Sequence, residues 1–123
     1  MNNKERCYNE MVIMRLIKLI VVLIMFFPAL SCANSVFTPG KVSKIILHDW
    51  GRVLVYLDSG INTNEGCEKK AAIVLDRGNQ HFAEMYSSLL SAYHAGTKVG
   101  GWVNGCDNLH KAPVLSRLDL MPK

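Results

Sequence analysis

Apolar residues in the second half of the chain recur with the period of a helix between residues 80 and 95. The apolar positions follow one another at steps of three and four residues: Phe82, Met85, Tyr86, Leu89, Leu90 and Tyr93. This spacing predicts an amphipathic helix whose apolar stripe packs against a core. Asn79 is the expected N-cap, and Gly96 is expected to end the helix in the left-handed conformation.

Five short segments around this helix have the composition of β-strands. They are residues 41–48, 52–58, 71–75, 98–104 and 114–120. Residues 49–51 are turn formers and predict a hairpin between the first two strands. Gly100 and Gly101 predict a bulge or a sharp bend in the fourth strand. The predicted fold class is therefore mainly β with one helix, in the order β-β-β-α-β-β. That is the element order of the OB-fold, a five-stranded Greek-key barrel.

The N-terminal part of the chain has a different pattern, which is typical of an export signal. Arg15 and Lys18 precede an uninterrupted run of 12 apolar residues, 19–30, and small residues follow it. A helix needs about 20 apolar residues to cross a bilayer, so the run is too short for an anchor and predicts a signal peptide over residues 1–33. The polar segment 1–11 is longer than such a signal needs, and we therefore expect translation to begin at Met14.

Two cleavage points compete at the end of this segment. Ser31 and Ala33 are the small residues that an ordinary signal peptidase reads, and a cut after Ala33 would remove Cys32. The sequence Leu30-Ser31-Cys32 also resembles the lipobox of bacterial lipoproteins, in which the cut precedes a lipidated cysteine. The match is imperfect because the leucine lies one position too close to the cysteine. Export to the periplasm, the envelope or the exterior is expected in both cases.

The segment that remains is one small domain with little net charge. We expect a short linker over residues 34–39 and an OB-like domain over residues 40–123. The whole chain carries a net charge of +4, of which the first 33 residues contribute half. The remaining +2 does not indicate a nucleic-acid-binding protein, so no nucleic-acid partner is expected.

Cysteine positions predict a covalent link within this domain. With Cys7 and Cys32 removed or lipidated, Cys67 and Cys106 form an even pair, and a disulfide is expected in an oxidising compartment. The two cysteines are 39 positions apart. Closing a loop of this length stabilises a fold by about 4 kcal/mol in the chain-entropy model. Cys106 and His110 have a spacing that occurs in zinc sites, but no fourth ligand and no CxxC pair accompany them. We therefore expect no metal and no cofactor.

Several of these features together resemble a known group of proteins. Cys67 precedes a strand, the helical segment MYSSLLSAYHAGTKV spans residues 85–99, and Gly105 and Cys106 follow. The arrangement is similar to a group of small exported proteins of Gram-negative bacteria, which in turn resemble the OB-type B subunits of subtilase-cytotoxin and pertussis-like AB5 toxins. The similarity covers about residues 40–118. It implies an OB-type barrel, and it makes a glycan ligand and a homo-oligomer expectations, but it identifies no sugar-contacting residue.

A catalytic role is not expected. His48 and Asp49 could be combined with a serine as a hydrolase site, but neighbouring side chains in a strand point to opposite faces and cannot form the usual relay. No Gly-x-Ser-x-Gly motif occurs in the sequence. The sequence therefore predicts that the protein is not an enzyme.

Ligand binding is the expected function, since OB-folds bind through strands two and three and the neighbouring loops. Trp50 in the first turn is the candidate surface aromatic residue, and Tyr56 on the second strand is either a ligand contact or core. The loops add amides and an imidazole, which belong either to a ligand site or to solvated loops: Asn62, Asn64, Asn108 and His110. We expect a binding module for a glycan or a protein, with a membrane contact only if Cys32 is lipidated. The alternative is a structural or accessory envelope lipoprotein tethered through Cys32.

Overall fold

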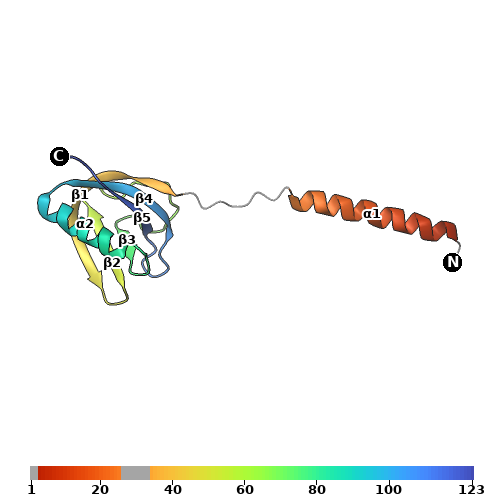
Figure 1. Ribbon diagram of the computed structural model, residues 1–123, viewed down its shortest axis with the longest axis horizontal. Helices are drawn as coiled ribbons and strands as arrows, with labels where there is room; N and C mark the ends of the chain where they lie inside the picture. The colour runs from red at the N-terminus through yellow and green to blue at the C-terminus, as the bar shows by residue number, and fades with distance from the viewer. Residues whose placement is uncertain (1–2, 26–33) are drawn as a thin grey trace. The chain divides into compact units, whose positions relative to one another are not determined.

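The computed structural model describes residues 3–25 and 34–123, which are drawn in colour in Figure 1. The chain divides into two units, one containing helix α1 (Asn3–Met25) and one containing all strands and helix α2 (Phe82–Ala95). The apolar run predicted as the core of an export signal begins within α1. Neither helix in the described part of the chain is long and apolar enough to cross a membrane. Cys32 and both proposed cleavage points lie outside the described residues.

The second unit confirms the predicted element order. Its strands are β1 (Ser35–His48), β2 (Arg52–Leu57), β3 (Ile73–Asp76), β4 (Lys98–Cys106) and β5 (Pro113–Leu120). The helix α2 lies between β3 and β4, as expected from the sequence. The mainly β class with five strands is therefore confirmed.

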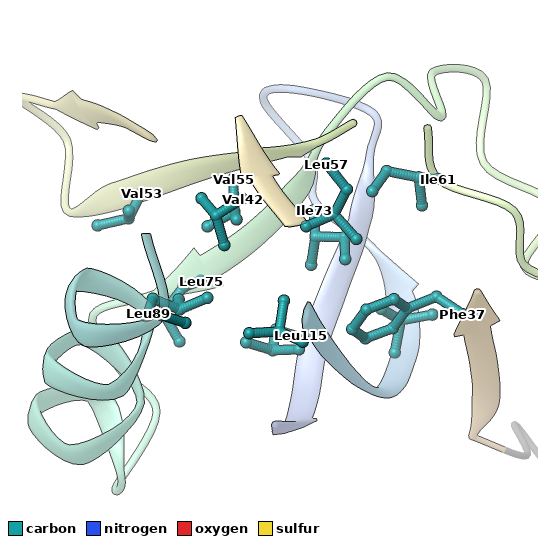
Figure 2. Packing of buried hydrophobic residues seen from close by; sticks show 13 residues of the cluster. Phe37, Val42, Val53, Val55, Leu57, Ile61, Ile73, Leu75, Leu89 and Leu115 are labelled. Atoms are coloured by element: carbon teal, nitrogen blue, oxygen red, sulfur yellow. The ribbon is translucent and has the colours of Figure 1, made fainter. Parts of the chain in front are cut away.

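The five strands form a closed barrel in the order β1-β2-β3-β5-β4. All neighbours are antiparallel except β3 and β5, which are parallel and paired at Val74 and Val114. The interior is filled by aliphatic side chains and Phe37, and Leu89 of α2 packs against them (Figure 2). Core positions recur at every second residue of β2, at Val53, Val55 and Leu57, because alternate side chains of a strand point to the same face.

The predicted linker 34–39 is wrong, because most of it is the first half of β1. Residues 35–41 pair with β4, whereas residues 42–48 pair with β2. Phe37 is 1% exposed in the barrel core, and the register shifts between Phe37 and Gly40. Pro39 lies within this irregularity, where a residue without an N–H group is tolerated. The bulge accommodates the proline within the strand.

Helix α2 departs from its prediction at both the N-terminus and the exposed face. Its N-cap is His81, without a side-chain capping bond, whereas the Asn79 side chain accepts a hydrogen bond from the His81 N–H. Gly96 ends the helix with φ 67°, as predicted. Of the predicted stripe only Leu89 is fully buried. Leu90 and Tyr93 lie on the exposed side of the helix, with 41% and 50% of their surface accessible. The barrel covers a narrower face of the helix than the sequence stripe suggests.

A second apolar cluster lies on the outer surface of the barrel. Leu54 and Val74 point away from the interior and pack with Ala72 and Ala112. Ala112 belongs to the segment between β4 and β5, which therefore covers part of the outer face of β2 and β3.

The predicted disulfide is present. Cys67 and Cys106 are bonded, with their Cα atoms 5.6 Å apart. Cys106 is the last residue of β4, and Cys67 lies in the segment between β2 and β3. The bond thus fixes the β2–β3 loop against the end of β4.

We expect Gly101→Ala to destabilise the domain far more than Gly105→Ala. Both glycines have positive φ, 147° and 69°, but a Cβ at Gly101 would overlap the carbonyl oxygen of Arg117 on β5. A Cβ at Gly105 meets nothing within 4 Å. Backbone strain and overpacking together should lower the free energy of unfolding by about 3 kcal/mol or more for Gly101→Ala, and strain alone by about 1 kcal/mol for Gly105→Ala. Urea denaturation measures both, and equal losses would contradict the close approach of β4 and β5.

Candidate functional site

The β1–β2 turn and the β4–β5 loop meet at one place on the outer surface of the barrel. We call this place the loop junction and define it by His48, Asp49, Trp50, Arg52, Asp107 and His110. Arg52 is its central residue, since it stands opposite His48 on β1 and opposite Asp76 on β3. Directly opposed residues of neighbouring strands share a face. The sheet register therefore places these side chains together on the outer face.

The Arg52 guanidinium holds the β4–β5 loop against the sheet. Its Nε donates a hydrogen bond to Asp107 Oδ1 at 2.8 Å, and its Nη1 lies 3.4 Å from Asp76 Oδ1. The Asp107 side chain is only 3% exposed, whereas that of Arg52 is 24% exposed. A buried carboxylate requires a partner, and removing that partner is strongly destabilising.

Hydrogen bonds keep Asp107 ionised in spite of its burial. Burial by itself raises the pKa of this carboxyl, but it is outweighed by a hydrogen bond from the His110 N–H, by the hydrogen bond and charge of Arg52, and by a hydrogen bond from the Leu109 N–H. The pKa of Asp107 therefore lies below its usual value. The hydrogen bond to Asp107 also raises the pKa of Arg52, although burial opposes this.

The β4–β5 loop is constrained along its whole length. The Asp107 N–H donates to the Ala112 carbonyl at 2.8 Å, and the Lys111 N–H donates to the Asp107 carbonyl at 2.9 Å. The Lys69 N–H donates to the Lys111 carbonyl, and the disulfide holds the residue before Asp107. Lys111 has φ 54°, the left-handed conformation that this tight closure requires. The loop is thus preformed, which lowers the entropy cost of binding a ligand.

Two histidines join the turn to the loop. The His48 and His110 rings are in edge-to-face contact, with centroids 4.9 Å apart. His48 Nδ1 is 3.0 Å from Asp49 Oδ1, so the expectation that these two side chains point to opposite faces is wrong. The physical reason is that β1 ends at His48, and Asp49 lies in the turn, where strand alternation no longer applies. His110 Nε2 is buried and has no hydrogen-bond partner among the described residues.

Trp50 is the exposed aromatic residue of the loop junction. It is 63% exposed, and its ring centroid lies 6.1 Å from that of His48. Leu109 on the facing loop is 49% exposed. The structure thus brings Trp50 and His110 together through His48, which their separation in the sequence does not reveal.

The other predicted contacts lie elsewhere or contribute less. Tyr56 is half-buried against the outer cluster, with the Lys44 ammonium 4.2 Å above its ring, so it belongs mainly to packing. Asn108 is exposed on the β4–β5 loop. Asn62 and Asn64 are exposed in the β2–β3 loop, whose hydrogen bonds lead to the start of β1: the Thr38 N–H donates to the Asn62 carbonyl. The structure does not connect these two asparagines with Trp50.

Arg52 and Asp107 are the residues that sequence reasoning missed. Their separation in the chain gives no local signal, although an arginine opening a strand directly after a turn suggests a role at that turn. Within the described residues, no group of three or more His, Cys, Asp or Glu side chains is arranged to hold a metal ion. The arrangement offers the exposed Trp50 indole, the Asp49 carboxylate and the His48 imidazole on a rigid frame, and such groups stack on and hydrogen-bond to a ligand.

Comparison with known proteins adds no relative: no family model, no curated protein and no solved structure matches this chain.

We expect Asp107→Asn to lower the free energy of unfolding by about 1 to 3 kcal/mol at neutral pH, because the charge-assisted bond to Arg52 is lost. The native pKa of Asp107 is depressed, so its contribution is complete above the unfolded-state pKa of about 3.9 and is lost as the pH falls through the native value. The difference between wild type and variant should therefore shrink below about pH 4. Urea denaturation between pH 2 and pH 7 measures it.

The matched control is Asp119→Asn. Asp119 accepts from Arg117 Nε at the same 2.8 Å, but the Arg117 side chain is 62% exposed. Exposed pairs contribute about 0 to 1 kcal/mol, so this variant should change little. A pH-independent loss in Asp107→Asn would contradict the role of the buried charge.

Proposed function

We propose that this protein is an exported OB-like binding module that holds a glycan or a protein ligand at the loop junction. The barrel order and the position of α2 support an OB-like fold, as does the parallel pairing of β3 with β5. In OB-folds the ligand face is formed by strands two and three with the loop between strands one and two and the loop between strands four and five. In this chain those two loops are the two halves of the loop junction.

The exposure of Trp50 is the observation that carries this proposal. An indole that is 63% exposed contributes nothing to the core, yet it lies on a turn that Arg52 and Asp107 tie to a rigid loop. An aromatic side chain on such a preorganised frame is typical of a binding hot spot. Asp49 and His48 beside it supply the hydrogen-bonding groups that a sugar hydroxyl or a peptide amide needs.

We expect Trp50→Ala to reduce ligand affinity at least tenfold without lowering thermal stability, because the ring is exposed. A glycan array and a bacterial-surface protein array, both probed with wild type, would identify the ligand class, and titration with the identified ligand would give the affinities.

Tyr93→Ala is the control for this experiment, since Tyr93 is an exposed aromatic residue on α2, away from the loop junction. It should bind as the wild type does. Equal binding by Trp50→Ala and wild type would show that Trp50 does not contact the ligand. The absence of wild-type binding on both arrays would contradict the proposal.

The alternative function is that of an envelope lipoprotein attached through Cys32. The sequence Leu30-Ser31-Cys32 favours it, and the disulfide suits an oxidising compartment in either case. Attachment would keep the domain at a membrane surface, whereas removal of Cys32 would leave it free.

The intact mass of the protein isolated from the cell envelope or the medium separates the two. We expect a chain that begins at Asn34 and is lighter than the reduced chain by the two hydrogens of one disulfide. A chain that begins at Cys32 and carries the mass of a diacylglyceryl group would instead establish the tethered form.

A further inference from the structure

A groove lies on the other side of the β1–β2 turn, between that turn and the first turn of α2. We call it the helix groove. Its volume is about 230 Å³, and its principal lining residues are Leu47, Val53, Phe82, Tyr86, Arg77 and His48. It adjoins the loop junction but does not include Trp50.

The floor of the helix groove is apolar and incompletely covered. Leu47 is 65% exposed, whereas Ile45, on the same face of β1, packs against the barrel core. The rings of Phe82 and Tyr86 are stacked at 5.8 Å and 10°, and both are half-buried. A surface of this kind remains available for an apolar group of a ligand.

The charge at the helix groove is positive, and it comes from Arg77. The Arg77 stem lies against Gly51, and its guanidinium carbon is 5.9 Å from the Phe82 ring centroid. No ion pair within residues 3–25 and 34–123 includes Arg77, and no carboxylate is part of the groove lining. Arg52, which also touches the groove, is occupied by Asp76 and Asp107.

Arg77 is the source of this positive charge, and the start of α2 does not add to it. The helix begins at Phe82, whose N–H donates to the Asn79 carbonyl, and the acidic Glu84 lies in its first turn. These groups offset the positive end of the helix dipole. A single negative group at the groove would therefore be attracted by the Arg77 guanidinium.

The volume restricts what can occupy the groove. Sites for small molecules usually measure 300 to 1,000 Å³, so about 230 Å³ lies below that range. A space of this size suits one amino-acid side chain rather than a drug-sized molecule.

We propose that the helix groove binds the C-terminal residue of a peptide or protein partner. The apolar side chain of that residue packs on Leu47, Phe82 and Tyr86, and its carboxylate receives hydrogen bonds from the Arg77 guanidinium, whose planar fork matches a carboxylate. This site shares His48 and Arg52 with the loop junction but does not include Trp50, and it assigns a second ligand class to the domain.

The test uses the full chain, purified as the cell processes it, with two peptides that differ only at the C-terminus. The first peptide is acetyl-Gly-Gly-Leu with a free carboxylate, and the second is the same peptide with a C-terminal amide. Titration followed by ¹⁵N–¹H NMR should show the acid form shifting the backbone amides of Leu47 and of residues 77–82, with the amide form binding at least tenfold more weakly. Acetate alone should shift none of these signals at the same concentration.

Variants test whether Arg77 supplies the charge that binds the peptide carboxylate. Arg77→Gln should weaken binding of the acid peptide at least tenfold, whereas Arg117→Gln, at an exposed arginine on β5, should leave it unchanged. Trp50→Ala should also leave it unchanged, which separates this site from the loop junction. Equal binding of the acid and amide peptides, or peptide-induced shifts outside the groove only, would overturn the proposal. If Arg77→Gln fails to fold, the comparison of the acid and amide peptides on the wild-type chain still tests whether the groove binds a C-terminal carboxylate.

Discussion

The double pairing of β1 is the constraint on which the rest of the domain depends. Its first half is bonded to β4 and its second half to β2, so one strand closes the barrel. The irregularities between Phe37 and Gly40 and between Val42 and Lys44 let the strand change partners. Bulges bend a strand and increase its twist, which barrel closure requires. Closure in turn satisfies the backbone groups that an open sheet edge would expose.

The loop junction follows from this closure. Because β1 runs on to His48 and returns at Arg52, the β1–β2 turn projects beyond the barrel and carries Trp50 with it. Arg52 then pairs with Asp107, and the disulfide fixes the residue before Asp107. Three kinds of interaction, a sheet ladder, a buried ion pair and a covalent bond, therefore converge on one pair of loops. This rigidity suits a binding surface, since a preformed site loses little entropy when a ligand binds.

Sequence patterns predicted the regular elements well, because their periodicity is local. The alternation at Val53, Val55 and Leu57 corresponds to the barrel interior, and Gly96 ends α2 as expected. Prediction failed where a distant partner decides the outcome. Phe37 appeared to lie in a linker because only its pairing with β4 makes residues 35–41 a strand. Leu90 and Tyr93 fit the helical stripe, but the barrel does not reach them.

The sequence by itself determined the element order, the disulfide pair and the candidate Trp50, because composition, spacing and turn chemistry carry those signals. Only the tertiary structure decided that His110 meets His48, that Arg52 neutralises the buried Asp107, and that Asn62 and Asn64 lie apart from this site. The physical reason is that these relations depend on strand register and barrel closure, which join residues far apart in the chain. The helix groove likewise exists only because the β1–β2 turn and the start of α2 are brought together by folding.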